Sequence, residues 1–130
     1  MSQDRESGAR AVEYGLQTAR KIAKKLGAKK IGKERSNEYK IGNKTIVIKC
    51  ARTTTKSVGV SYHMLNRLST ILGSFETDNG TYDLYEMKPS TYRENMRPTG
   101  STGASAGRVG IVRKSVFLDQ GTFVMNVEIE

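Results

Sequence analysis

Residues 36–52 read SNEYKIGNKTIVIKCAR, and two runs with strand character flank the dipeptide Gly42-Asn43 in this stretch. A two-residue loop that begins with Gly favours a primed turn, whose backbone twist matches the strands of a β-hairpin. Because the turn sets the register, we expect Glu38 to face Val47 across the ribbon. Lys49 then lies on the same face, diagonal to Glu38 and close enough for the two long side chains to meet.

The second strand of this hairpin is apolar on both faces except at Lys49, which is typical of a sheet that is covered on both sides. One interpretation is a cross-strand ion pair between Glu38 and Lys49 on a half-solvated ribbon. Removing such a pair from water is costly without further partners, so a carboxylate and an amine that face a covered cleft also form a candidate functional site. The residues alone leave both interpretations open.

The spacing of these residues resembles the core motif of the PD-(D/E)XK nucleases, a superfamily that contains restriction endonucleases and archaeal Holliday-junction resolvases. Glu38 matches the first acid of that motif, and Lys49, in the run Val47-Ile48-Lys49, matches its lysine. The sequence departs from the motif at Val47, which stands where the second acid belongs. Relocation of that acid, for instance to Glu34, is one way in which the motif would be completed.

The resemblance implies a metal-dependent DNA endonuclease of the restriction or junction-resolving kind. Mg²⁺ (or Mn²⁺) would be bound by Glu38, by the backbone carbonyl of Ile48 and, through water, by Glu13 in the first helix. Lys49 would assist the attacking water, so Glu38, Lys49 and Glu13 are the expected catalytic residues. The missing acid leaves two alternatives open. One is a catalytically inactive nucleic-acid-binding module on the same fold, and the other is a basic subunit that binds an acidic protein partner.

Charge is distributed unevenly along the 130 residues, whose formal net charge is +9. Residues 1–56 hold fifteen Lys/Arg and five Asp/Glu, whereas residues 57–130 hold seven and eight. Such a field favours a polyanionic partner, and nucleic acid is the commonest one for a small protein. We expect double-stranded or branched DNA to contact a set of basic residues: Lys21, Lys24, Lys25, Lys29, Lys30, Lys33, Arg52 and Lys56. Because a duplex has two strands, a two-fold symmetric homodimer is expected.

The length of the chain predicts a single domain over residues 1–130. The single Cys50 cannot form an internal disulfide, and no apolar run is long enough for a signal sequence or a membrane span. A reduced, cytoplasmic location without a membrane partner is therefore expected. His63 has no second ligand at zinc-site spacing, so it is expected to be an ordinary residue at a helix start.

Hydrophobic periodicity predicts an amphipathic helix from Asp4 or Ser7 to Gly27, with a basic ridge along its last turns. A strand, a helix and a strand are expected after the hairpin, over residues 57–62, 63–73 and 82–87. This order resembles the α-β-β-β-α-β core of the restriction-endonuclease-like fold. The expected fold class is therefore α/β with a mixed α+β sheet, and its core spans about residues 5–88.

The last third of the chain is expected to extend this core. Residues 97–107 are rich in Gly, Ser and Thr, which predicts a mobile loop. Residues 108–130 are expected to form a C-terminal β-hairpin around Asp119-Gln120-Gly121, because apolar and polar residues alternate in its second strand.

Overall fold

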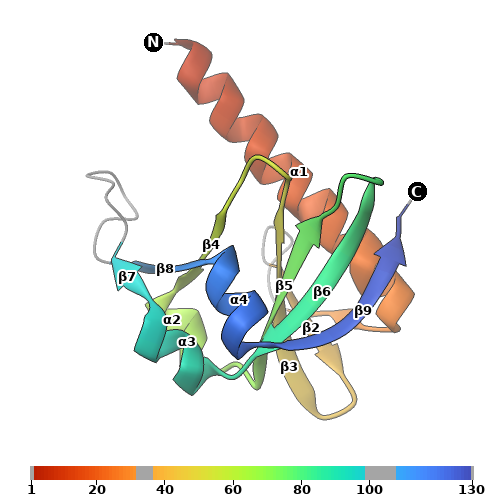
Figure 1. Ribbon diagram of the computed structural model, residues 1–130, viewed down its shortest axis with the longest axis vertical. Helices are drawn as coiled ribbons and strands as arrows, with labels where there is room; N and C mark the ends of the chain where they lie inside the picture. Colours follow the sequence, from red (N-terminus) through yellow and green to blue (C-terminus); the bar gives the residue numbers. More distant parts are fainter. Residues whose placement is uncertain (1, 32–36, 99–107, 130) are drawn as a thin grey trace.

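A computed structural model describes residues 2–31, 37–98 and 108–129, and for residues 2–12 it describes the backbone alone. Its centre is a mixed six-stranded sheet in the order β1-β2-β3-β5-β6-β9, beside a three-stranded sheet in the order β4-β8-β7 (Figure 1). The strands are β1 (Lys29–Lys30), β2 (Glu38–Ile41), β3 (Lys44–Ala51), β4 (Ser57–Ser61), β5 (Thr70–Glu76), β6 (Thr81–Met87), β7 (Arg97–Pro98), β8 (Val109–Arg113) and β9 (Thr122–Glu128). The helices are α1 (Ser2–Leu26), α2 (Tyr62–Leu65), α3 (Pro89–Asn95) and α4 (Lys114–Gln120). The fold is therefore mixed α+β.

The expected hairpin is confirmed as β2 and β3. Gly42 has a φ of 57°, and no residue other than glycine has a positive φ in the described part of the chain, as a type II′ turn requires. Glu38 lies opposite Val47, and Ile41 lies opposite Lys44. Because side chains alternate along a strand, Glu38, Val47 and Lys49 share one face of the large sheet.

The large sheet is covered on both faces. α1 packs on one face, where Ala19, Ile22 and Ala23 join a buried cluster with strand residues that include Ile46, Ile48, Leu72 and Leu84. The three-stranded sheet and helices α2 to α4 cover the opposite face, in a second cluster that includes Val47, Ala51, Val58, Val60, Phe75, Tyr92 and Phe117. The hairpin therefore presents Glu38 and Lys49 to the second layer and not to α1 (Figure 1).

The predicted first helix is confirmed, although it begins earlier than expected, at Ser2. It ends at Leu26 because Gly27 adopts a φ of 73°, the left-handed conformation that commonly terminates a helix. Leu16, Ala19, Ile22 and Ala23 from the expected apolar stripe are buried. None of the helices in the described part of the chain combines the length and the apolar composition that crossing a membrane requires.

The helix predicted for residues 63–73 is wrong beyond its first turn. α2 ends at Leu65, and residues 70–76 form β5, which pairs with β3 in parallel so that Ile48 lies opposite Leu72. All five residues from Ile71 to Phe75 are buried. A strand that is buried on both faces shows no alternation of apolar and polar residues, so its spacing resembled that of a helix.

The C-terminal β-hairpin predicted for residues 108–130 is also wrong. β8 pairs with β4 and β7 in the small sheet, and β9 pairs with β6 at the edge of the large one. α4 lies between them because Phe117 is fully buried, packed edge-on against Phe75 and Tyr92. Of the predicted mobile loop, Arg97–Pro98 form β7, and residues 99–107 lie outside the described residues.

Candidate functional site

The buried carboxylate of Glu38 is paired with Arg67 and not with Lys49. Arg67 Nη2 donates to Glu38 Oε1 at 2.6 Å, and Arg67 Nε donates to Glu38 Oε2 at 2.9 Å. The Glu38 side chain is 7% exposed and the Arg67 side chain 46%. The hydrogen bond to Glu38 raises the pKa of the Arg67 guanidinium. A forked pair of this geometry holds both carboxylate oxygens in fixed positions. The interpretation of a Glu38–Lys49 ion pair is therefore wrong, because the cation comes from the segment after α2.

Lys49 lies on the same face as Glu38, further along β3, opposite Gly73 of β5. The side chain enters the covered layer, and the loss of hydration lowers the pKa of its amine below the ordinary value. Burial also raises the pKa of the neighbouring Cys50 thiol, to about 12. The thiol is therefore a poor nucleophile at neutral pH, whereas the amine of Lys49 releases its proton more readily than an exposed lysine does.

The described residues around Glu38 do not fit a Mg²⁺ site. Val47, opposite Glu38, is fully buried and offers no ligand atom. Ile48 turns its side chain toward α1, and its N–H donates to the Asn37 carbonyl within the strand ladder. Both Glu38 oxygens are bonded to Arg67, and no group of three or more His, Cys, Asp or Glu side chains in the described residues is placed to hold a metal ion. Glu34, where the second acid was sought, lies outside the described residues.

Glu13 is not brought to Glu38. Its side chain is exposed on α1 and accepts a hydrogen bond of 2.8 Å from Gln17 Nε2, one helical turn later. α1 covers the face of the sheet that carries Ile46 and Ile48, whereas Glu38 faces the opposite layer. The three expected catalytic residues therefore divide into Glu38 and Lys49 on one face and Glu13 on the other.

Basic side chains concentrate around one edge of the large sheet. Among the described residues between positions 20 and 44, eight are Lys or Arg and one, Glu38, is acidic. We call the eight the basic edge: Arg20, Lys21, Lys24, Lys25, Lys29, Lys30, Lys40 and Lys44. All are exposed except Lys30, which is partly buried with its ammonium 5.4 Å from the centre of the Tyr39 ring. Lys33 lies outside the described residues.

Two lysines of the basic edge face each other directly. Lys29 of β1 and Lys40 of β2 are cross-strand partners on the same face as Glu38. Like charges at opposite positions in a ladder repel each other. An anion placed between them would relieve that repulsion, so this position favours a negatively charged ligand.

Arg52, another expected contact to nucleic acid, lies away from the basic edge. Its guanidinium stacks 4.1 Å from the centre of the Tyr14 ring, and the Tyr14 hydroxyl shares a hydrogen bond with the Tyr82 hydroxyl. The Arg52 contact ties the end of β3 to α1. We expect its replacement to reduce packing as well as charge.

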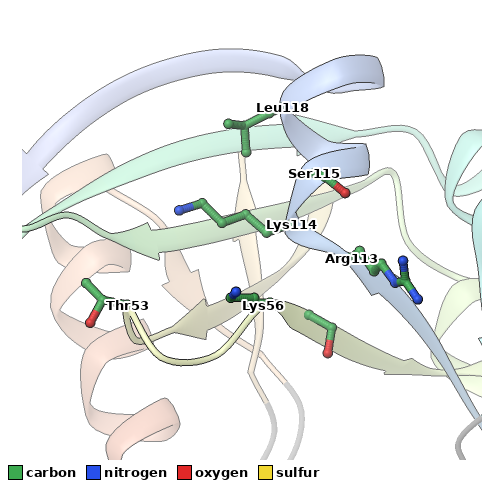
Figure 2. A pocket seen from close by; sticks show the side chains of 7 residues that line it. Thr53, Lys56, Arg113, Lys114, Ser115 and Leu118 are labelled. Atoms are coloured by element: carbon green, nitrogen blue, oxygen red, sulfur yellow. The ribbon is translucent and has the colours of Figure 1, made fainter.

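Lys56 lines a pocket formed by the β3–β4 connection, the adjoining ends of β4 and β8, and α4. Figure 2 shows it with Thr53 from the β3–β4 connection and with Arg113 and Lys114 at the junction of β8 and α4. The pocket has a volume of about 590 Å³. Sequence reasoning identified Lys56 but missed Arg113 and Lys114, since they are more than fifty residues away along the chain.

Comparison of the chain with known protein families and with curated protein sequences finds no match. The resemblance to the PD-(D/E)XK nucleases therefore depends on the residues of the hairpin and on the expected order of helices and strands.

Proposed function

We propose that this protein is a nucleic-acid-binding module on a restriction-endonuclease-like fold, without cleavage at Glu38. The observation that carries the proposal is the basic edge, whose eight cations share their described stretch of the chain with a single acid, and that acid is bonded to Arg67. Two effects favour the binding of a polyanion here. Its phosphates attract the cations, and they relieve the repulsion between Lys29 and Lys40. Double-stranded or branched DNA is the proposed ligand.

The topology of the sheet supports the fold part of the proposal. α1 is followed by β2 and β3, which are antiparallel, and by β5, which is parallel to β3. β4 and α2 lie in the connection between β3 and β5. The chain departs from the expected core at its third strand, because β4 lies in the three-stranded sheet, while the strand expected over residues 82–87 is β6, antiparallel to β5.

The test of binding is a titration of labelled duplex, branched and single-stranded DNA at several salt concentrations. We expect affinity to fall linearly with the logarithm of salt concentration, with a slope that corresponds to several phosphate contacts. An acidic protein of similar net charge serves as the competitor. Displacement of DNA by that protein at equal charge concentration would favour the alternative of a protein-interaction subunit.

The rival proposal is a Mg²⁺- or Mn²⁺-dependent endonuclease of the restriction or junction-resolving kind. The position of Lys49 beside the Glu38 face favours it, but the ion pair with Arg67 opposes it. Supercoiled, linear and branched DNA incubated with Mg²⁺, Mn²⁺ or EDTA tests it directly. The Arg67→Ala variant sharpens the assay, because it removes this cation from both oxygens of Glu38. Metal-dependent nicking by either protein that Glu38→Ala abolishes would overturn the non-catalytic proposal.

We also propose that the protein is a homodimer formed through β9. In the described part of the chain, the exposed large hydrophobic side chains are all on β9 or the preceding helix: Leu118, Phe123, Val124 and Met125. β9 is an edge strand, so its outer backbone groups are open to strand addition. Antiparallel pairing of two β9 strands about Met125 would place Thr122 of one copy opposite Glu128 of the other, which keeps the two carboxylates apart. The resulting dimer would be two-fold symmetric, with a continuous sheet across the β9–β9 contact.

A further inference from the structure

The pocket that Lys56 lines is formed by cations and hydroxyl groups from three segments of the chain. The β3–β4 connection and β4 contribute Thr53, Lys56 and Ser57, β8 contributes Arg113, and α4 contributes Lys114, Ser115 and Leu118. Three of the seven side chains are positively charged, three carry a hydroxyl group, and none is acidic. The wall therefore offers hydrogen-bond donors and positive charge with no competing carboxylate.

One described acid, Glu76, contacts the backbone of a lining residue. Glu76, at the end of β5, accepts a hydrogen bond from the Thr53 backbone N–H at 3.1 Å. It is not one of the lining residues. Among the described residues, no acid forms an ion pair with Lys56, Arg113 or Lys114, so their charges remain available to a ligand.

Backbone hydrogen bonds hold the segments that line the pocket. Ser57 and Arg113 are direct partners in the β4–β8 ladder, and the Lys114 N–H donates to the Lys56 carbonyl at 2.7 Å. The Lys114 ammonium lies 5.7 Å from the centre of the Phe75 ring in the core. Figure 2 shows the charged ends of Lys114 and Arg113 extending in opposite directions from the start of α4. Because the ladder fixes the backbone of all three cations, less ordering is required when a ligand binds.

The positive charge of the wall favours a phosphate group with a larger negative charge. An internal phosphodiester carries one negative charge, whereas a terminal phosphate carries about 1.5 to 2 at neutral pH. The three lining cations carry more positive charge than one phosphodiester neutralises, so the second group matches the lining better. The volume of about 590 Å³ exceeds what a phosphate needs, and the half-exposed Leu118 gives the same pocket an apolar side for a sugar or base.

We propose that this pocket binds a phosphomonoester, either the terminal phosphate of a nucleic-acid strand or a free nucleoside monophosphate. The inference deepens the proposed function, because a strand held on the basic edge would have one end available to a second site. Neither source alters the chemistry of the pocket, which recognises the dianionic phosphate.

The test compares a short 3′-labelled oligonucleotide that ends in a 5′-phosphate with the same strand ending in a 5′-hydroxyl. We expect the phosphate to increase affinity roughly tenfold, the gain typical of one or two charge-assisted hydrogen bonds. The double variant Lys56→Ala/Arg113→Gln should lose this preference. The matched control Lys88→Ala/Arg93→Ala removes the same charge elsewhere and should keep it. Competition by adenosine 5′-monophosphate, and not by adenosine, identifies the free nucleotide as the source.

The failure of this inference is distinguishable from failure of the proposed function. If the protein binds no DNA but binds adenosine 5′-monophosphate in a manner that requires Arg113, the pocket stands and the DNA proposal fails. If DNA binds with equal affinity with and without the 5′-phosphate, and adenosine 5′-monophosphate does not bind, the pocket proposal is overturned. Circular dichroism and the melting temperature of each variant confirm that the compared proteins are folded.

Discussion

The two edges of the six-stranded sheet are built in opposite ways (Figure 1). At one edge, β1 is two residues long, and Lys29, Lys30 and Lys40 stand on it and its neighbour. At the other, β9 has seven residues, and the five from Thr122 to Asn126 are exposed in succession. A short edge rich in lysine resists the addition of another strand, whereas a long apolar edge invites it. The first edge is thus suited to a polyanion and the second to a β-strand of another chain.

The largest effect is expected from reversing charge at the basic edge. Lys29→Glu combined with Lys40→Glu should weaken DNA binding roughly 100-fold at low salt and reduce the salt slope by about two. Anisotropy titrations at several salt concentrations measure both quantities. The control Arg93→Glu/Arg97→Glu makes the same change in net charge on α3 and on β7 of the small sheet. Equal weakening by the two double variants would mean that net charge, and not the basic edge, attracts DNA.

The second largest effect is expected on stability, at the ion pair between Glu38 and Arg67. Arg67→Ala should lower the free energy of unfolding by about 2 kcal/mol, because it leaves the buried Glu38 carboxylate without this cation; the half-exposed position of Arg67 keeps the loss below that of a fully buried pair. Chemical denaturation measures the change. Arg93→Ala is the matched control, since Arg93 is exposed and donates only to Asn66 Oδ1 at 2.7 Å. A loss no greater than that of Arg93→Ala would contradict the structural role of the pair.

At the opposite edge, Val124→Lys should weaken self-association roughly tenfold, because it places a charge in an apolar interface that two-fold symmetry repeats. Sedimentation equilibrium over a range of protein concentrations measures the dimer constant. Lys29→Ala, on β1 at the other end of the strand order, should leave that constant unchanged. A monomeric wild-type protein at high concentration would show that another molecule covers β9.

The smallest effect is expected on the melting temperature, from replacing Lys49 of β3, which lies between the two edges of the sheet. Its pKa is lowered by burial, so in the range between the folded and unfolded pKa values the unfolded chain binds more protons, and stability rises with pH. Below that range the full cost of burying the charge is present. Lys49→Met should therefore raise the melting temperature at neutral pH by a few degrees, and the gain should shrink as pH approaches about 10. A gain that is constant with pH would indicate better packing and not the removal of a buried charge.

Local patterns predicted those parts of the molecule that local interactions determine. The β2–β3 register followed from Gly42 and the alternation of side chains, and the end of α1 followed from Gly27. The strand β5 was missed because burial on both faces removes the alternation that marks a strand. α4 was missed because Phe117 adopts its position through contacts with Phe75 and Tyr92, which are distant in sequence.

The candidate sites show the same division. Glu38, Val47 and Lys49 were placed correctly relative to one another, since a single turn relates them. The partner of Glu38 was not predicted, because Arg67 reaches Glu38 only when the chain after α2 folds over the hairpin. A buried acid in a covered strand does signal that the covering layer supplies a cation, and Arg67 is the lone charge in the run from His63 to Ile71. The pocket required contacts between Lys56 and Lys114 that no periodicity reveals.

The pairing of β4 with β8 also bears on how the chain reaches its folded state. Ser57 meets Arg113, and until that later segment has been synthesised the sheet face that carries Val47, Ala51 and Phe75 lacks part of its cover. Contacts between segments so far apart slow folding, because a long loop must close before they are made. Chains stalled before β8 would expose apolar surface and depend on chaperones, whereas α1 and the β2–β3 hairpin would already have been able to form.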